Sequence, residues 1–268
     1  MTGIMNGKRG LIMGVANSHS IAWGIAQKLA GQGAELAFTY QGEALGKRVK
    51  PLAAELGSDF VIPCDVEDIA SVDATLDAIK EKWGKLDFVV HAIGFSDKNE
   101  LKGLYADTSR ENFSRTMVIS CFSFTEIAKR AAGLMNEGGA MLTLTYGGST
   151  RIMPNYNVMG VAKAALEASV RYLAGDYGPR GIRVNAISAG PIRTLAGAGI
   201  SDARAMLSWQ QKNAPLRRTV TIEDVGNSAL YLLSGLSSGV TGEIHYVDSG
   251  YNITSMPAID ALRTADTE

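Results

Sequence analysis

The chain lacks most features that mark disulfide-stabilised, metal-binding or nucleic-acid-binding proteins. Its 268 residues include two cysteines and three histidines, and none of them lies with carboxylates at a spacing that suits a metal ion. Two cysteines in a chain of this length are typical of a reducing compartment, so we expect a cytoplasmic protein. The formal net charge is −1 and no basic block occurs, which argues against a nucleic-acid partner.

Long apolar segments are missing as well. A helix that crosses a bilayer needs about 20 apolar residues in a row, and no run in this chain comes near that length. The first residues contain no apolar core of a secretory signal, so we expect no membrane insertion. No linker-like stretch or internal repeat divides the chain, and a single domain over residues 1–268 is predicted.

What the chain does have is a regular alternation of short apolar runs with segments of helical spacing. The runs are Leu11–Val15, Glu35–Tyr40, Phe60–Val66, Leu86–Ile93, Ala140–Tyr146, Ile182–Ser188 and Glu243–Asp248. Such runs are typical of parallel strands buried on both faces, and Ile21–Ala30 and Ser71–Trp83 between them have helical periodicity. The pattern predicts an α/β protein: a single-domain Rossmann fold with a doubly wound seven-stranded parallel sheet and helices on both faces.

A stretch of small residues, Gly14–Gly24, directly follows the first expected strand. Small residues let the backbone turn tightly, and the N–H groups at the start of the next helix can then face a pyrophosphate. A plain strand–turn–helix connection is the alternative, but the position after the first strand favours phosphate binding. Gly14, Ser20 and Ile21 are therefore candidate cofactor-binding residues.

The residue after the second strand bears on the choice of cofactor. An acidic residue there commonly binds the adenosine ribose, but this chain has Gln41. Gln41 can still bind a ribose hydroxyl, and it lacks the charge that would repel a 2′-phosphate. Lys47 and Arg48 follow and could meet such a phosphate, although a solvated helix face is favoured for them. These residues leave the choice between NADH and NADPH open.

The third and fourth strands end in further candidates for the cofactor site, Asp65–Val66 and Ile93–Gly94. Asp65 can accept a hydrogen bond from an adenine amino group, or it can form a turn or cap before the next helix. The small residue at 94 lets a cofactor lie over the sheet edge. His91, in the same apolar strand, is predicted to be a core residue with satisfied hydrogen bonds.

Tyr156 and Lys163 form the candidate catalytic pair. They are seven residues apart, which places both side chains on one helix face. A phenol with a pKa of about 10 is a poor acid–base group at neutral pH, and a nearby ammonium is expected to favour the phenolate. The spacing alone is common, but its place after the fifth strand puts the pair across the sheet from the glycine loop.

Together, Gly14…Gly24, Ile93-Gly94, Tyr156-x6-Lys163 and Ile187-Ser-Ala-Gly-Pro191 resemble the short-chain dehydrogenase/reductase superfamily over essentially the whole chain. The resemblance implies a Rossmann fold, a nicotinamide cofactor and a homotetramer. Common members have a serine shortly before the catalytic tyrosine. Here Thr143 takes that register and a second tyrosine stands at 146.

These departures, with the divergent glycine loop, resemble the bacterial enoyl-acyl-carrier-protein reductases of the FabI type. Further matching motifs are Tyr40-Gln41-Gly42, Cys64-Asp65-Val66, Ala92-Ile93-Gly94-Phe95, Gly190-Pro-Ile192-Arg-Thr194-Leu195-Ala196 and Arg217…Gly226. The resemblance implies that NADH reduces the carbon–carbon double bond of a trans-2-enoyl thioester carried by an acyl carrier protein, in type II fatty-acid biosynthesis.

The resemblance also assigns roles to residues. Tyr156 would stabilise the enolate, and Lys163 would hold the cofactor ribose. Tyr146, the third implied catalytic residue, would border the acyl pocket and help to orient or protonate the substrate. The implied cofactor-binding residues are Gly14, Ser20, Ile21, Gln41, Asp65, Val66, Ile93, Gly94, Lys163, Ile192, Thr194, Leu195 and Ala196. The implied substrate-binding residues are Ser96, Tyr146, Tyr156, Met159, Ile200 and Met206. Core packing is a nearly equal alternative for Met159.

Residues 194–213 are expected to form a substrate-binding lid within the domain. Gly197 and Gly199 resemble a hinge, and Met206 and Leu207 could cover an acyl chain. An ordinary surface helix is the alternative. Ala203 stands where the family often has an aromatic residue, which leaves pocket width and inhibitor sensitivity open.

Two other functions are compatible with the same fold. One is a ketone- or alcohol-specific reductase of the superfamily, against which Tyr146 and the missing serine argue. The other is a non-catalytic nucleotide sensor, against which the intact Tyr156 and Lys163 argue.

Overall fold

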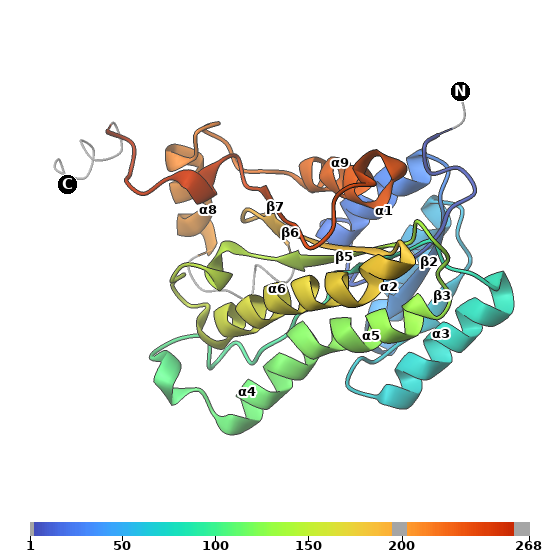
Figure 1. The fold of residues 1–268 in the computed structure, drawn as a ribbon. Helices are drawn as coiled ribbons and strands as arrows, with labels where there is room; N and C mark the ends of the chain where they lie inside the picture. The colour runs from blue at the N-terminus through green and yellow to red at the C-terminus, as the bar shows by residue number, and fades with distance from the viewer. Residues whose placement is uncertain (1–2, 195–202, 260–268) are drawn as a thin grey trace.

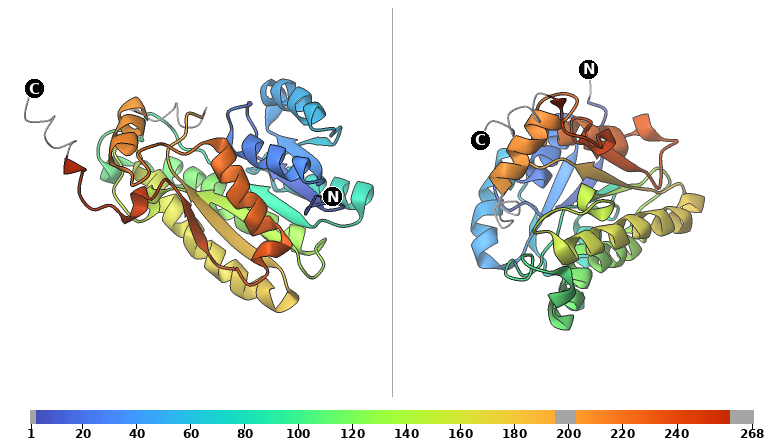
Figure 2. Two further views of the ribbon diagram at one scale, coloured as in Figure 1. Left: turned by 90° about the horizontal axis from the view of Figure 1, so that it is seen from above. Right: turned by 90° about the vertical axis from the view of Figure 1, so that its left-hand side faces the viewer.

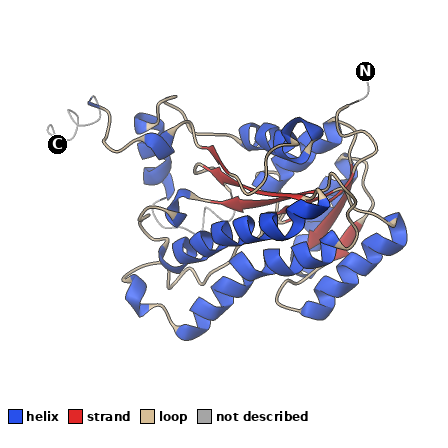
Figure 3. Cartoon of the chain, viewed as in Figure 1, coloured by secondary structure: helices blue, strands red, loops and turns tan. Residues whose placement is uncertain are grey.

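A computed structural model describes residues 3–194 and 203–259 of the chain. In these residues seven strands form one parallel sheet in the order β3-β2-β1-β4-β5-β6-β7. Figure 3 draws the strands in red. The strands are β1 (Arg9–Met13), β2 (Glu35–Tyr40), β3 (Val61–Pro63), β4 (Phe88–His91), β5 (Ala140–Thr145), β6 (Arg183–Ala189) and β7 (Ile244–Val247). The order reverses between β1 and β4, which is the switch point where α/β sheets bind ligands.

Helices cover both faces of the sheet (Figures 1 and 2). They are α1 (Ile21–Gly31), α2 (Gly42–Glu55), α3 (Ile69–Trp83), α4 (Arg110–Met117), α5 (Ser123–Ala132), α6 (Asn157–Tyr177), α8 (Ala203–Asn213) and α9 (Ile222–Leu233). Shorter turns are η1 (Tyr105–Asp107), the π-helical η2 (Val118–Phe122), η3 (Gly147–Ser149), η4 (Gly178–Arg180), η5 (Gly235–Ser237) and η6 (Tyr251–Ile253). The predicted doubly wound fold is confirmed.

Each face of the sheet has its own apolar core. Apolar side chains of α1, α2 and α9 pack on one face around Phe38 and Phe88. Those of α3, α5 and α6 pack on the other face around Val89 and Phe124. Because both faces are covered, strand side chains that point to either face are buried, which explains the continuous apolar runs in the sequence.

Two predicted strands are four residues longer in the sequence pattern than in the structure. The runs Phe60–Val66 and Leu86–Ile93 contain strands of only three and four residues, β3 and β4. The remaining apolar residues lie in loops that the core also covers; Cys64 and Val66, for example, are both 6% exposed. Apolarity here reports burial and does not separate a strand from the loop that follows it.

Two glycines allow α1 and α9 to pack closely. A Cβ at Gly24 would lie 2.5 Å from the carbonyl oxygen of Ile222, and one at Gly226 would lie 2.6 Å from the carbonyl oxygen of Gly24. Gly24, the last glycine of the Gly14–Gly24 motif, is therefore required for helix packing.

Candidate active site

The turn after β1 can hold only glycine at position 14. Gly14 has φ 97°, and a Cβ there would lie 2.1 Å from the carbonyl oxygen of Ala92, just after β4. The turn therefore keeps the ends of β1 and β4 in contact and leaves no side chain over the switch point.

The Ser20 hydroxyl forms hydrogen bonds within the glycine loop and does not cap the helix that follows. The hydroxyl accepts hydrogen bonds from the N–H groups of Ala16 and Asn17, at 3.0 and 3.1 Å. Ser20 is the N-cap residue of α1, which begins at Ile21, but it makes no side-chain hydrogen bond to the helix. The first N–H groups of α1 are thus left for an anion, as the phosphate-binding interpretation requires.

Gln41 and Asp65 meet at the ends of β2 and β3. Gln41 Nε2 donates to Asp65 Oδ2 at 3.0 Å, and Asp65 Oδ1 accepts from Glu67 N at 2.9 Å. Of the alternatives for Asp65, the turn is present, while the cap of α3 is Asp68. A carboxylate therefore stands beside Gln41, although position 41 itself is uncharged. Lys47 and Arg48 are exposed on α2.

Tyr146 and Tyr156 form a pair at the carboxyl end of β5. Their ring centroids are 5.2 Å apart with the planes at 73°, an edge-to-face arrangement. Tyr156 is the N-cap residue of α6, so it precedes the helix that was predicted to contain it. Its neighbours Asn155 and Asn157 have φ of 56° and 33°, a left-handed conformation that asparagine tolerates better than most residues.

The expectation that a nearby ammonium favours the Tyr156 phenolate is wrong. Tyr156 is 7% exposed, and burial, with a smaller contribution from Tyr146, raises its pKa well above the usual value. Burial, with a contribution from Tyr251, also raises the pKa of Tyr146 to about 12. Both phenols therefore keep their protons at neutral pH, because removing water from a phenolate costs more than the surroundings return.

Lys163 is a buried residue of α6 that lies next to the loop after β4. It is 7% exposed, and its Nζ donates to the carbonyl oxygen of Leu144 at 2.8 Å. Burial lowers the pKa of Lys163 to about 8. A Cβ at Gly94 would lie 3.7 Å from Lys163 Nζ and 3.6 Å from Met159 Cε. The structure thus brings together Gly94, Met159 and Lys163 from two elements.

The loop after β4 is tied to α4 and η2 by buried hydroxyl groups. Ser96 accepts from Thr116 Oγ1 at 2.9 Å and donates to Asn112 Oδ1 at 3.3 Å. Ser120 Oγ bonds both the N–H and the carbonyl group of Phe95, each at 2.9 Å. Ser96, a predicted substrate residue, therefore has its hydroxyl engaged in loop anchoring.

His91 is confirmed as a satisfied core residue. It is fully buried, with Nδ1 3.3 Å from Thr143 Oγ1 and Nε2 2.9 Å from Ser123 Oγ. Burial lowers its pKa to about 3, so it is neutral at physiological pH. Thr143 stands in the register where common superfamily members have serine. Its hydroxyl lies within hydrogen-bond distance of the His91 ring and donates to the His91 carbonyl group.

A cavity opens beside Tyr146, between η3 and the end of β7. Its walls include Arg151, Pro191, Gln210 and Tyr251.

The remaining predicted site residues lie elsewhere in the fold. Met206 is half-buried in α8. Ile192 packs against the core of the α1 face, and Ile93 packs against the core of the opposite face. Thr194 is half-buried. Leu195, Ala196 and Ile200, with the predicted hinge glycines Gly197 and Gly199, lie outside the described residues.

Sequence reasoning missed the groups that form hydrogen bonds to Lys163 and to the loop after β4. The Leu144 carbonyl group carries no side-chain signal, and Asn112, Thr116 and Ser120 lie in helices without a local motif. Asn155 and Asn157 could have been noticed, because asparagines on both sides of a tyrosine mark a backbone that departs from ordinary φ values.

Neither a metal cluster nor a membrane span is found in the described residues. Across 3–194 and 203–259, no three or more His, Cys, Asp or Glu residues gather at a metal-binding distance. No helix in those ranges is long and apolar enough to cross a membrane.

Comparisons with known proteins point to one family. The family model described as enoyl-(acyl carrier protein) reductase matches residues 14–252. The enoyl-[acyl-carrier-protein] reductase [NADH] 2 of Rhizobium meliloti is 88% identical over the full length of both chains. The FabI reductase of Rickettsia felis is 58% identical over 94% of this chain and 97% of its own.

Solved structures agree with the sequence comparison. The crystal structure of FabI from Candidatus Liberibacter asiaticus has a TM-score of 0.94 at 67% identity, covering 96% of this chain and all of its own. The Anaplasma phagocytophilum reductase, solved in complex with NAD, has a TM-score of 0.92 at 55% identity, covering 97% of each chain. Both the fold and the sequence place the chain in the enoyl-(acyl carrier protein) reductase family.

Proposed function

We propose that the chain is an NADH-dependent enoyl-[acyl-carrier-protein] reductase of type II fatty-acid biosynthesis. The observation that carries this proposal is the Tyr146–Tyr156 pair at the carboxyl end of β5, with the buried Lys163 bonded to the Leu144 carbonyl group of the same strand. The relatives named above, up to 88% identical, are reductases of this kind. The Rossmann architecture and the threonine at position 143, in the register where common superfamily members have serine, fit the same activity.

The residues at the switch point fit a dinucleotide. Gly14 keeps side chains away from the turn, and the uncapped start of α1 suits a pyrophosphate. Gln41 and Asp65 would bind the adenosine end, and Lys163 and Gly94 would lie at the nicotinamide end. We assign NADH to this site, and when bound it supplies the hydride that the reduction needs.

Tyr156 would hold a proton where negative charge develops. The phenol is protonated at neutral pH, so it would donate a hydrogen bond to the thioester oxygen as that oxygen becomes an enolate. Tyr146 packs against its ring and limits its motion. Lys163, cationic below about pH 8, would bind ribose hydroxyls and lower the cost of negative charge nearby.

We assign an acyl carrier protein as the macromolecular partner, with α8 at its docking side. In Figure 1, α8 stands on the side where α6 begins. The helix has exposed Arg204 and Lys212 and no acidic residue, so it suits a negatively charged carrier. Residues 194–213 would act as the lid, with half-buried Met206 and Leu207 facing the acyl chain. We also propose a homotetramer that works in the cytoplasm.

The activity is tested by following oxidation of NADH and of NADPH with a medium-chain trans-2-enoyl thioester. We expect turnover with NADH, slower turnover with NADPH, and reduction of crotonyl but not acetoacetyl thioesters. Reduction of the acetoacetyl thioester alone would identify a ketone reductase instead. NADH binding with no turnover on any enoyl thioester would identify a nucleotide sensor.

The lid is tested by amide hydrogen exchange over residues 194–206. We expect protection to increase when NADH and an acyl ligand are both bound, because the apolar positions then have a surface to cover. Equal protection in the free, NADH-bound and ternary states would mean that this segment is an ordinary surface element.

A further inference from the structure

A buried carboxylate lies behind the proposed catalytic residues. Glu167 is on α6, four residues after Lys163, so the two side chains share the helix face that packs on β5. Glu167 is 6% exposed, although acidic residues are rarely buried to that extent without a partner. Its Oε1 accepts a hydrogen bond of 2.7 Å from Thr145 Oγ1, and Thr145 is 5% exposed.

This contact joins α6 to the last residue of β5. Lys163 bonds the carbonyl group of Leu144, and Glu167 bonds the hydroxyl of Thr145. The next residue is Tyr146, whose ring packs on Tyr156. Two successive turns of α6 therefore hold two successive residues of β5, directly before the strand delivers a tyrosine to the site.

We propose that Glu167 is a positioning residue of the active site: by accepting a hydrogen bond from Thr145, it fixes the strand end that carries Tyr146 and the carbonyl group bound by Lys163. The proposal rests on the roles proposed above for Tyr156 and Lys163. Small displacements of a catalytic group cost large factors in rate, so an anchor one residue away affects turnover.

Glu167 also contributes charge next to Lys163. Titratable side chains influence Lys163 from three elements: Glu167 on α6, Cys121 on η2 and His91 on β4. Burial raises the pKa of Cys121 and lowers that of His91, so both are neutral at physiological pH. Cys121 and, to a smaller extent, Glu167 favour the ammonium form of Lys163, and Glu167 is the carboxylate of the two.

The hydrogen bond is tested by removing the hydroxyl with little change of shape. Thr145→Val should lower kcat/KM for the enoyl thioester roughly tenfold, because the end of β5 loses its anchor. Thr145→Ser keeps the hydroxyl and should retain activity within about threefold. Thr75→Val is the matched control, since Thr75 is a fully buried threonine on α3 that donates to the Ser71 carbonyl group. It should lower the Tm but leave kcat/KM unchanged.

The charge is tested with Glu167→Gln, which keeps an acceptor oxygen for Thr145. NADH affinity, measured by fluorescence between pH 6.5 and 9.5, should fall at a pH roughly half a unit to one unit lower than in the wild type. The sign follows from Lys163: without the carboxylate its ammonium form is less favoured, so the cation is lost earlier as pH rises.

Two results would overturn the proposal. One is that Thr145→Val and Glu167→Gln lower the Tm as Thr75→Val does but keep the wild-type kcat/KM and pH profile, which would make Glu167 a packing residue. The other is that Thr145→Ser fails as badly as Thr145→Val, because the hydroxyl would then not be the cause. Tyr156→Phe in the same assays tests the proposed catalytic role of Tyr156 separately from the positioning role of Glu167. Wild-type turnover of Tyr156→Phe would refute the catalytic role itself.

Discussion

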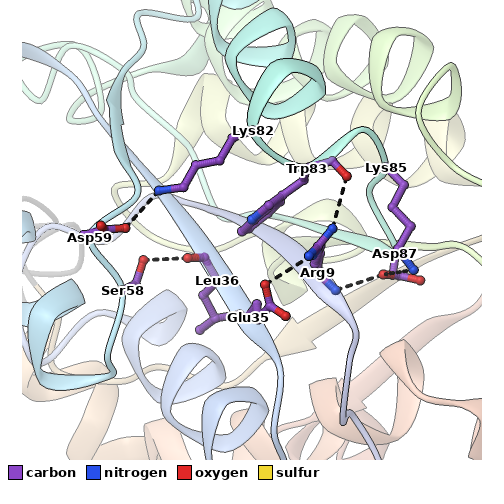
Figure 4. A network of polar contacts seen from close by, with 9 residues as sticks. All are labelled: Arg9, Glu35, Leu36, Ser58, Asp59, Lys82, Trp83, Lys85 and Asp87. Atoms are coloured by element: carbon purple, nitrogen blue, oxygen red, sulfur yellow. Dashed lines mark hydrogen bonds and ion pairs between the residues drawn. The ribbon is translucent and has the colours of Figure 1, made fainter.

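The two edges of the sheet use polar residues in opposite ways. At the amino edge of β1, β2 and β4, charged side chains are paired and partly exposed (Figure 4). Arg9 bonds Glu35 at 3.2 Å and the Trp83 carbonyl group at 3.1 Å, and Asp87 accepts from Lys8 and from the Arg9 N–H. At the carboxyl edge, Tyr156 and Lys163 are buried, and Lys163 Nζ donates to the carbonyl oxygen of Leu144, not to a carboxylate.

The difference separates stability from chemistry. Exposed pairs lie in water, each contributes little, and their loss leaves the rest of the fold in place. Buried titratable groups have shifted pKa values and are expensive to keep, which is typical of functional sites. Substitutions at the carboxyl edge should therefore change turnover, and substitutions at the amino edge should change only stability.

The largest effect is expected at Tyr156. Tyr156→Phe removes the hydroxyl that would donate to the enolate oxygen but keeps the ring that packs on Tyr146. We expect kcat to fall roughly ten- to a thousandfold, the usual range for loss of one such donor, while the Tm changes by only a few degrees. Steady-state kinetics with thermal unfolding checks both, and wild-type turnover would remove the distinction between the edges.

The next largest effect is expected at Lys163. Its pKa is lowered to about 8, so the ammonium predominates below that pH and is lost above it. NADH affinity should consequently fall as pH rises through about 8. Lys163→Ala should weaken NADH binding roughly tenfold or more at pH 7, since a hydrogen bond to a charged group contributes about 1.5–3 kcal/mol.

The control for Lys163 is the shape of the pH profile. Lys163→Ala has no group that titrates near pH 8 at this place, so its NADH affinity should be flat between pH 7 and 9 in a fluorescence titration. A variant that keeps the wild-type pH dependence would show that another group titrates there.

The fold could be predicted because it follows from local pattern. Strand burial on both faces, the turn at Gly14 and the spacing of Tyr156 and Lys163 are all local in sequence. The pKa of Tyr156 could not be predicted, because it depends on how deeply tertiary packing buries the ring. The same holds for the bond between Gln41 and Asp65, residues 24 positions apart that only strand pairing brings together.

A smaller effect is expected for cofactor choice at Gln41. Gln41→Arg introduces a cation that could bind a 2′-phosphate, so the kcat/KM ratio should shift towards NADPH. The neighbouring Asp65, which now accepts from Gln41 Nε2, would pair with the new arginine and limit the shift to roughly severalfold. Combining Gln41→Arg with Asp65→Asn should enlarge the shift, because the competing carboxylate is gone.

The kcat/KM values for NADH and for NADPH are measured at saturating thioester for Gln41→Arg, for Asp65→Asn and for the double variant. If the native protein strongly prefers NADPH, the exposed Lys47 and Arg48 bind the phosphate and their interpretation as solvated surface is wrong. If Asp65→Asn alone already admits NADPH, the carboxylate and not the glutamine is what selects NADH.

The smallest effect is expected at the amino edge, where Arg9→Met tests the comparison from the other side. Methionine keeps an apolar stem near the Trp83 ring, over which the guanidinium lies at 5.9 Å, but removes the bonds to Glu35 and the Trp83 carbonyl group. Since the side chains of Arg9 and Glu35 are 31% and 53% exposed, we expect the free energy of unfolding to fall by about 1 kcal/mol.

Urea unfolding at low and high salt measures that change. The difference from wild type should shrink in high salt, because salt screens the exposed Arg9–Glu35 pair. Steady-state kcat and KM should stay at wild-type values, as Arg9 lies at the opposite end of β1 from Gly14. A loss of activity without a matching loss of stability would mean that the amino edge is coupled to the site, and the separation of the two edges would then fail.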